Sequence, residues 1–155
     1  MPQEPSHSTV SKSTMNASCV LMSIGNQTML RSLKTILDPH IEVCAMADNV
    51  LSLIDSIEAL EPELAIIHTT KLDREHISMT QHLQSRFPKL KMVVVSDCTE
   101  SAIVRNVLDQ GVHGFVFQQN AKAELVIAVR KVLQGGTYVS SIDSQEGEDR
   151  AKLQD

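Results

Sequence analysis

The sequence predicts an α/β fold in which a parallel sheet is covered by helices on both faces. Short apolar runs alternate five times with segments whose apolar residues recur at helical spacing. The short runs are apolar throughout, as is typical of strands that are buried on both faces of a sheet. An α/β layer fold with one antiparallel strand is the alternative, and the regular alternation disfavours it.

The first two strands are expected at residues 19–24 and 41–45. Between them lies an amphipathic helix for which Asn26 is the expected N-cap. A second helix follows, with Asp48 or Asn49 as its cap. The apolar positions of these helices are Met29, Leu30, Leu33, Ile36 and Leu37 in the first, and Val50, Leu53, Ile54, Ile57 and Leu60 in the second.

The remaining strands are expected at residues 64–67, 92–95 and 115–117, where the apolar runs are short and rich in β-branched residues or Phe. Helices separate them. The second helix is expected to end at Pro62, and the third to run from about Asp73 to Phe87, where Pro88 stops it. The fourth is expected to be capped by Thr99 and closed by Gly111, and the fifth to end at Gly135–Gly136. Residues 1–17 are polar and 140–155 are polar and acidic, so a folded domain of residues 18–139 is expected between a disordered tail and an acidic tail or interdomain linker.

Composition excludes several classes of function. The chain has 155 residues, a net charge of −5 and only 3% aromatic residues. Base-stacking surfaces need aromatic residues and duplex binding needs a basic surplus, so this segment is not expected to bind nucleic acid itself. It has no apolar run as long as a membrane span, and its three cysteines form no CxxC pair. We therefore expect a cytoplasmic protein without membrane contact.

Four stretches resemble a known family: EPELAII at residues 61–67, RFPKLKMVVVS at 86–96, GVHGFVF at 111–117 and VLQGGTYV at 132–139. They are similar to the receiver (CheY-like) domain of two-component response regulators, closest to the branch with a LuxR-type helix-turn-helix. The resemblance implies a flavodoxin-like three-layer sandwich, with a five-stranded parallel sheet in the order 2-1-3-4-5 and five helices. It also implies an Asp that accepts a phosphoryl group, an acid pair for Mg²⁺, a hydroxyl and a Lys.

Most of these chemical positions are altered in this sequence. The phosphoacceptor position holds His68, the acid-pair positions hold Gly25 and Asn26, and the lysine position holds Gln118, while Ser96 keeps the hydroxyl. Without the carboxylates there is little to hold Mg²⁺. Without Mg²⁺ and Lys, no positive charge would offset the negative charge of a phosphoryl group. We therefore expect a degenerate site, with no aspartyl phosphorylation, no metal, no cofactor and no enzymatic activity.

His68 allows three interpretations. It could accept a phosphoryl group itself, but a nucleophile needs activating partners and none is evident in the sequence. It could be a pH switch, which a lone titratable residue supports weakly. The favoured interpretation is that the ring fills the vacated pocket and bonds Ser96 or Asn26.

The other histidines and the cysteines could suggest a metal site, but they fall on different predicted elements, so the surface interpretation is preferred. These residues are His40, His76, His82, His113, Cys44 and Cys98.

Two further features concern partners. Phe115 matches the aromatic residue that, in the family, turns inward on phosphorylation, and here its orientation should be fixed or set by a partner. Val126, Ile127 and Leu133 exceed what one core-facing helix stripe needs, so they are a candidate interface or lie under neighbouring loops.

Together these features predict an atypical receiver domain that acts in transcription regulation through a protein partner or as a homodimer. A small-ligand-binding pseudo-receiver is the alternative, and a phosphotransfer protein using His68 is a weaker one. The acidic tail favours a segment cut from a regulator whose DNA-binding domain follows it.

Overall fold

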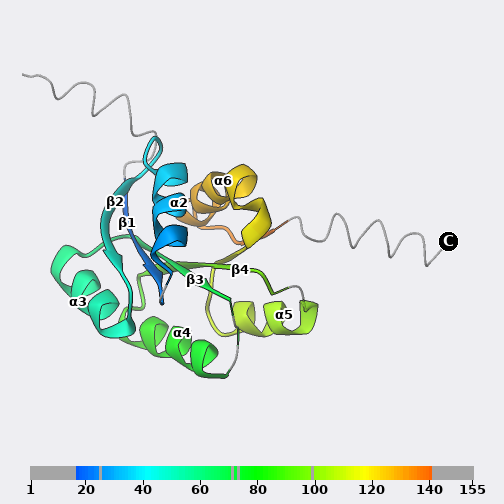
Figure 1. The fold of residues 1–155 in the computed structure, drawn as a ribbon. Coiled ribbons are helices and arrows are strands. Elements are labelled where there is room, and N and C mark those ends of the chain that lie inside the picture. The colour runs from blue at the N-terminus through cyan, green and yellow to red at the C-terminus, as the bar shows by residue number, and fades with distance from the viewer. Residues whose placement is uncertain (1–16, 25, 71, 73, 99, 141–155) are drawn as a thin grey trace, which may run out of the picture.

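Strands and helices alternate along the chain, as the sequence predicts (Figure 1). The computed structural model describes residues 17–24, 26–70, 72, 74–98 and 100–140, so the two expected tails lie outside the described residues apart from Ala17 and Ser140. The elements are β1 (Ser18–Ser23), α2 (Gln27–Leu37), β2 (Glu42–Ala47), α3 (Val50–Leu60), β3 (Leu64–Thr69), α4 (Arg74–Arg86), β4 (Lys91–Ser96), α5 (Ser101–Asp109), β5 (Gly114–Phe117), the short 3₁₀ helix η1 (Gln118–Asn120), α6 (Ala121–Leu133) and β6 (Tyr138–Val139).

The sheet is parallel and its order is β2-β1-β3-β4-β5-β6. This confirms the flavodoxin-like order of the first five strands and excludes an antiparallel strand among the six described. The expected number of strands was wrong, because β6 pairs with β5 through Tyr138 and Val139. Two residues are too few to produce the apolar run by which a strand is predicted.

Helices cover both faces of the sheet, and Figure 1 shows α2 and α6 on one side and α3, α4 and α5 on the other. The core is accordingly split into two apolar layers. One layer packs Leu33 of α2 and Val129 of α6 against β1, β3 and β4. The other packs Leu53 of α3, Leu83 of α4 and residues of α5 against the opposite face. The two edge strands are the least buried of the six described, because Ala47 is the one buried residue of β2 and β6 has none.

The predicted helix caps are confirmed where the structure describes them. The side chain of Asn26 accepts a hydrogen bond from the Met29 N–H at 3.0 Å, and Asn49 accepts one from the Ser52 N–H at 2.9 Å. Thr99, the expected cap of α5, lies outside the described residues, and Glu100 is in the N-cap position without a side-chain cap bond.

A buried carboxylate fastens β6 to α6. Glu124 is 8% exposed and accepts hydrogen bonds from the Tyr138 hydroxyl at 2.9 Å and the Ser140 hydroxyl at 2.8 Å. Burial and this contact raise the pKa of Tyr138 to about 12.

Gly135, with φ of 96°, turns the chain out of α6 towards β6. Among the described helices, none has the length and apolar character that crossing a membrane requires.

Candidate functional site

The candidate site lies where the carboxyl ends of the central strands meet, which is where ligands bind in open parallel sheets. The register places Ser23 of β1 beside His68 of β3, and Ser96 of β4 beside Phe117 of β5. Ser23, His68 and Ser96 are at most 2% exposed. The end of the sheet therefore presents a compact group of buried polar side chains.

His68 is the centre of this group and is bonded on both sides of its ring. Its Nδ1 lies 2.8 Å from the Ser23 hydroxyl, and its Nε2 lies 2.7 Å from the side-chain oxygen of Gln118. An amide oxygen can only accept, so with this amide orientation Nε2 carries the proton and donates. In the neutral ring Nδ1 then accepts from Ser23, and both ring nitrogens are satisfied by uncharged partners.

The expected partners of His68 were wrong. Ser96 was one, but its hydroxyl accepts the Cys98 N–H at 3.1 Å and so holds its own loop. Asn26 was the other, but its side chain caps α2. The ring bonds Ser23 and Gln118 instead, because parallel register puts Ser23 on the same face of the sheet as His68.

Ser23 is the site residue that the sequence analysis missed. It ends β1 directly opposite His68, whereas Asn26 already belongs to the cap of α2. Gly25 lies outside the described residues. A signal was present in the sequence, since Ser23 is the one polar residue within the run at 19–24.

The described members of the site are Ser23, His68, Ser96 and Gln118, and none of these side chains is a carboxylate. The nearest acid in sequence to Ser96 is Asp97, whose side chain is exposed. Among the described residues, no group of three or more His, Cys, Asp or Glu side chains is arranged to hold a metal ion. What the site can do chemically, from these residues, is donate and accept neutral hydrogen bonds.

Phe115 is fully buried on β5, within the apolar layer that contains α3, α4 and α5. Its ring thus already points inward. On α6, Val126 and Leu133 are half-buried and pack against the other layer, while Ile127 is 51% exposed. Of the three candidate interface residues, Ile127 offers the most open apolar surface.

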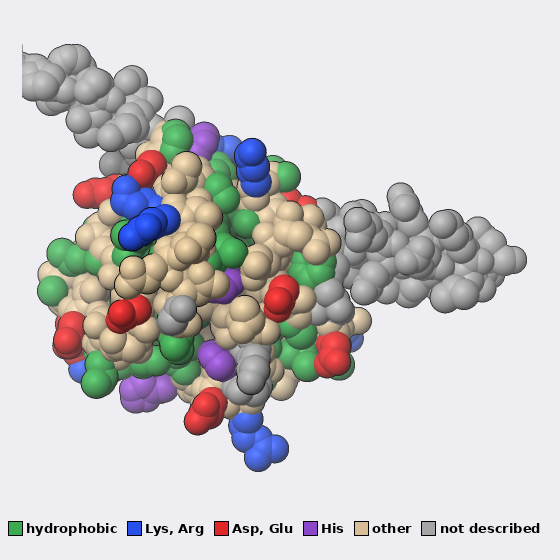
Figure 2. Space-filling view, in the orientation of Figure 1, with side chains coloured by type: hydrophobic (Ala, Val, Ile, Leu, Met, Phe, Trp, Pro, Cys, Tyr) green, Lys and Arg blue, Asp and Glu red, His purple; other side chains and the backbone are tan. Residues whose placement is uncertain are grey.

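The remaining histidines and cysteines lie outside the candidate site, and Cys44 lies beside Cys19, because its thiol donates a hydrogen bond to the Cys19 carbonyl at 3.2 Å. His113 accepts the Met92 N–H at 3.1 Å through its Nδ1, and burial together with the nearby Lys91 lowers its pKa. Burial raises the pKa of the Cys19 thiol to about 12 and also raises that of Cys44. These thiols are therefore poor nucleophiles. On the face seen in Figure 2, acidic and basic side chains are interspersed with neutral ones.

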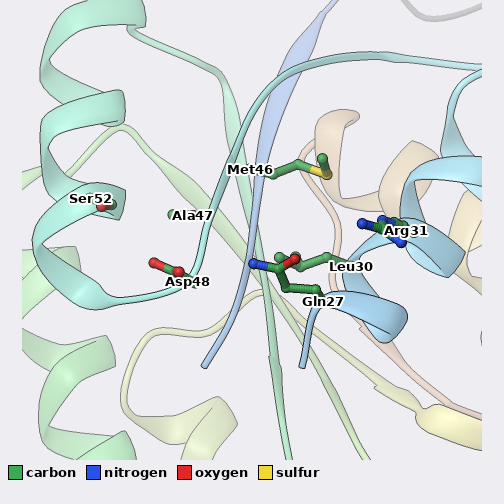
Figure 3. Close-up of a pocket in the computed structure, with 7 residues that line it drawn as sticks. All are labelled: Gln27, Leu30, Arg31, Met46, Ala47, Asp48 and Ser52. Atoms are coloured by element: carbon green, nitrogen blue, oxygen red, sulfur yellow. The ribbon is translucent and has the colours of Figure 1, made fainter. Parts of the chain in front are cut away.

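A pocket of about 270 Å³ lies beside the site, between α2, the end of β2 and the start of α3 (Figure 3). Gln27 and Arg31 line it from α2, and Asp48 and Ser52 face them from the other side. Met46 is a large apolar residue in the lining. The pocket thus combines a guanidinium, a carboxylate, an amide and a hydroxyl.

Comparison with known proteins points to one group. No family model matches the chain. The transcriptional regulatory protein DegU of Brevibacillus brevis is 26% identical over 116 residues, which are 74% of this chain and 49% of DegU. The transcriptional activator protein ExaE of Pseudomonas putida is 33% identical over 88 residues, 55% of this chain and 41% of ExaE.

Solved structures agree on the fold. The isolated receiver domain of RcsB from Salmonella enterica serovar Typhimurium, in its apo form, superposes with a TM-score of 0.73 at 20% identity. That match covers 86% of this chain and 99% of the RcsB domain. A LuxR-family two-component response regulator from Aurantimonas sp. SI85-9A1 gives a TM-score of 0.71 at 20% identity, covering 88% and 99% of the two chains.

The chain is thus similar in sequence to these transcription regulators, and its folded part has the fold of the receiver domains of response regulators. The chain spans about half the length of the curated relatives that it matches. The similarity is therefore to part of those regulators, and His68 lies near the end of β3, in the middle of the sheet.

Proposed function

We propose that this receiver domain regulates transcription without being phosphorylated by the usual aspartyl route, and that it acts through protein contacts. The observation that carries the proposal is the hydrogen-bonded group of Ser23, His68 and Gln118. Phosphoryl transfer to a receiver needs a carboxylate nucleophile, ligands for Mg²⁺ and a cation near the phosphoryl oxygens. An imidazole, a hydroxyl and an amide stand in this place.

The same group argues against His68 as a phosphoacceptor. A nucleophilic nitrogen needs a free lone pair and access to the phosphoryl donor. The His68 side chain is 2% exposed, Nδ1 takes the Ser23 hydroxyl as partner and Nε2 takes Gln118. Attack would first require one of these buried hydrogen bonds to break.

Signal transmission must then come from binding. The buried inward position of Phe115 supports a domain held in one conformation, and the exposed Ile127 on α6 supports a protein contact at that helix. DNA binding is proposed only for a further domain of the full-length regulator.

Intact-mass spectrometry after incubation with acetyl phosphate and Mg²⁺ tests the proposal, with a phosphorylatable receiver as positive control. We expect no phosphate adduct on this chain while the control becomes modified. An adduct that persists in His68→Ala would show another acceptor in the chain. An adduct lost in His68→Ala would make His68 a phosphoacceptor. Either adduct would overturn the proposal.

A second candidate function, small-ligand binding, is favoured by the pocket between α2 and α3. Arg31 and Asp48 offer opposite charges across a space of about 270 Å³, which suits a small zwitterion such as an amino acid. Thermal shift with a panel of amino acids tests it, and a saturable rise in Tm that Arg31→Ala and Asp48→Ala remove would support it.

A further inference from the structure

A large hollow lies at the end of the sheet opposite to the candidate site, where β3 and β4 begin. Its volume is about 720 Å³. It is bordered by the end of α3 and the residues before β3 on one side, and by the end of α4 and the residues before β4 on the other. We call it the basal groove.

The α3 side of the basal groove is acidic. Glu58, Glu61 and Glu63 line it, and Glu61 and Glu63 are exposed. All three lie within six positions of the chain at the junction of α3 and β3. They form one negatively charged wall.

The α4 side is basic. Arg86, Lys89 and Lys91 line it, with Arg86 and Lys89 exposed and Lys91 half-buried. They come from the end of α4 and the start of β4. The groove therefore has two walls of opposite charge, each carrying three charged side chains.

The floor between the walls is apolar and includes Phe87 and Pro88. At one point the walls meet, because Arg86 pairs with Glu58 and its guanidinium lies 5.5 Å from the centre of the Phe87 ring. For the other four wall residues, two acids and two lysines, the described part of the chain provides no ion-pair partner. These four charges are available to a partner.

We propose that a second copy of this chain docks in the basal groove. A two-fold contact uses the same surface on both copies, so the surface must be complementary to itself. A two-fold axis along the groove places the acidic wall of each copy opposite the basic wall of the other, over the apolar floors. Glu61 and Glu63 then face Lys89 and Lys91 in both halves of the contact. The proposal adds a dimer contact to the proposed function and holds whether or not His68 is phosphorylated.

The dimer should be weak and sensitive to salt. Exposed charges contribute little affinity and mainly fix the orientation of a contact, and salt screens them. We expect sedimentation velocity of the chain to show a monomer–dimer equilibrium at low ionic strength that shifts to monomer when salt is added.

Charge reversal tests the pairing of the walls. Lys89→Glu with Lys91→Glu makes both walls acidic, and Glu61→Lys with Glu63→Lys makes both basic. Each double variant alone should be monomeric, and an equal mixture of the two should form a heterodimer. Lys122→Glu with Lys131→Glu on α6, whose side chains are exposed, changes the net charge as the first variant does and should leave the dimer intact.

Three results would overturn the proposal: a wild-type chain that stays monomeric at high concentration and low salt, groove variants that still form homodimers, or a mixture that does not associate. Loss of the dimer only in the α6 variant would place the contact at α6. Far-UV circular dichroism of each variant confirms that it is folded.

Discussion

Removing the His68 ring should destabilise the domain strongly. The ring is 2% exposed and makes two side-chain hydrogen bonds, at 2.8 Å and 2.7 Å. Each is worth about 1 kcal/mol, and the Ser23 hydroxyl left without its partner costs about 1–3 kcal/mol more. We therefore expect His68→Ala to lower the free energy of unfolding by about 3–5 kcal/mol, and Tm by about 12–20 °C.

The assay is urea unfolding followed by far-UV circular dichroism, since the chain has no Trp. His82→Ala is the matched control, because His82 is exposed on α4, and its effect should stay within about 0.5 kcal/mol. Adding Ser23→Ala to His68→Ala should recover about 1 kcal/mol, since the orphaned hydroxyl is then gone. A loss below about 1 kcal/mol for His68→Ala would refute the reasoning that this group holds the strand ends together.

Three other predictions concern pH and backbone strain. His113 has a lowered pKa and accepts the Met92 N–H, so stability should fall as pH drops below about 6.5, and His113→Asn should flatten this decline in Tm. Tyr138 has a pKa raised to about 12, so stability should fall as pH rises above about 10. Tyr138→Phe should remove part of that loss, but it should lower the free energy of unfolding by about 1 kcal/mol at neutral pH because the hydrogen bond to Glu124 is lost. Glu61 has φ of 48°, a left-handed conformation unfavourable for residues other than Gly, so Glu61→Gly should raise the free energy of urea unfolding by about 1 kcal/mol in dilute solution.

Each of these has a clear contrary result. An acid decline that is unchanged in His113→Asn would move its cause to other groups. If stability falls as much at high pH in Tyr138→Phe as in the wild type, the cause would be another group such as Cys19, whose pKa is also raised to about 12. A destabilised Glu61→Gly variant would show that the backbone at this helix end is not strained.

Much of the fold could be predicted because local patterns determine it. Buried strands need continuous apolar runs, and helices need capping residues, so Asn26 was identified as a cap and Asn49 as one of two candidates for the next one. β6 escaped prediction because it consists of Tyr138 and Val139 alone and depends on pairing with β5 and on the contact with Glu124.

The site was harder to predict than the fold. That His68 stands at the end of β3 follows from the sequence, but its partners depend on strand register and on the direction of side chains from elements far apart in the chain. Ser23 and Gln118 are 45 and 50 residues away from it. Similarly, the helical pattern showed surplus apolar residues on α6, but only packing shows that Val126 and Leu133 are half-buried while Ile127 is exposed.

The most direct test of the central claim is an NMR titration of the ¹⁵N-labelled domain with Mg²⁺ and then beryllofluoride, which mimics a phosphoryl group. A site formed by neutral groups around His68 should bind neither, so the amide signals of Ser23, Ser96, Phe115 and Gln118 should not move. Saturable shifts of these signals would contradict the account and show that the site still functions as a phosphorylatable receiver.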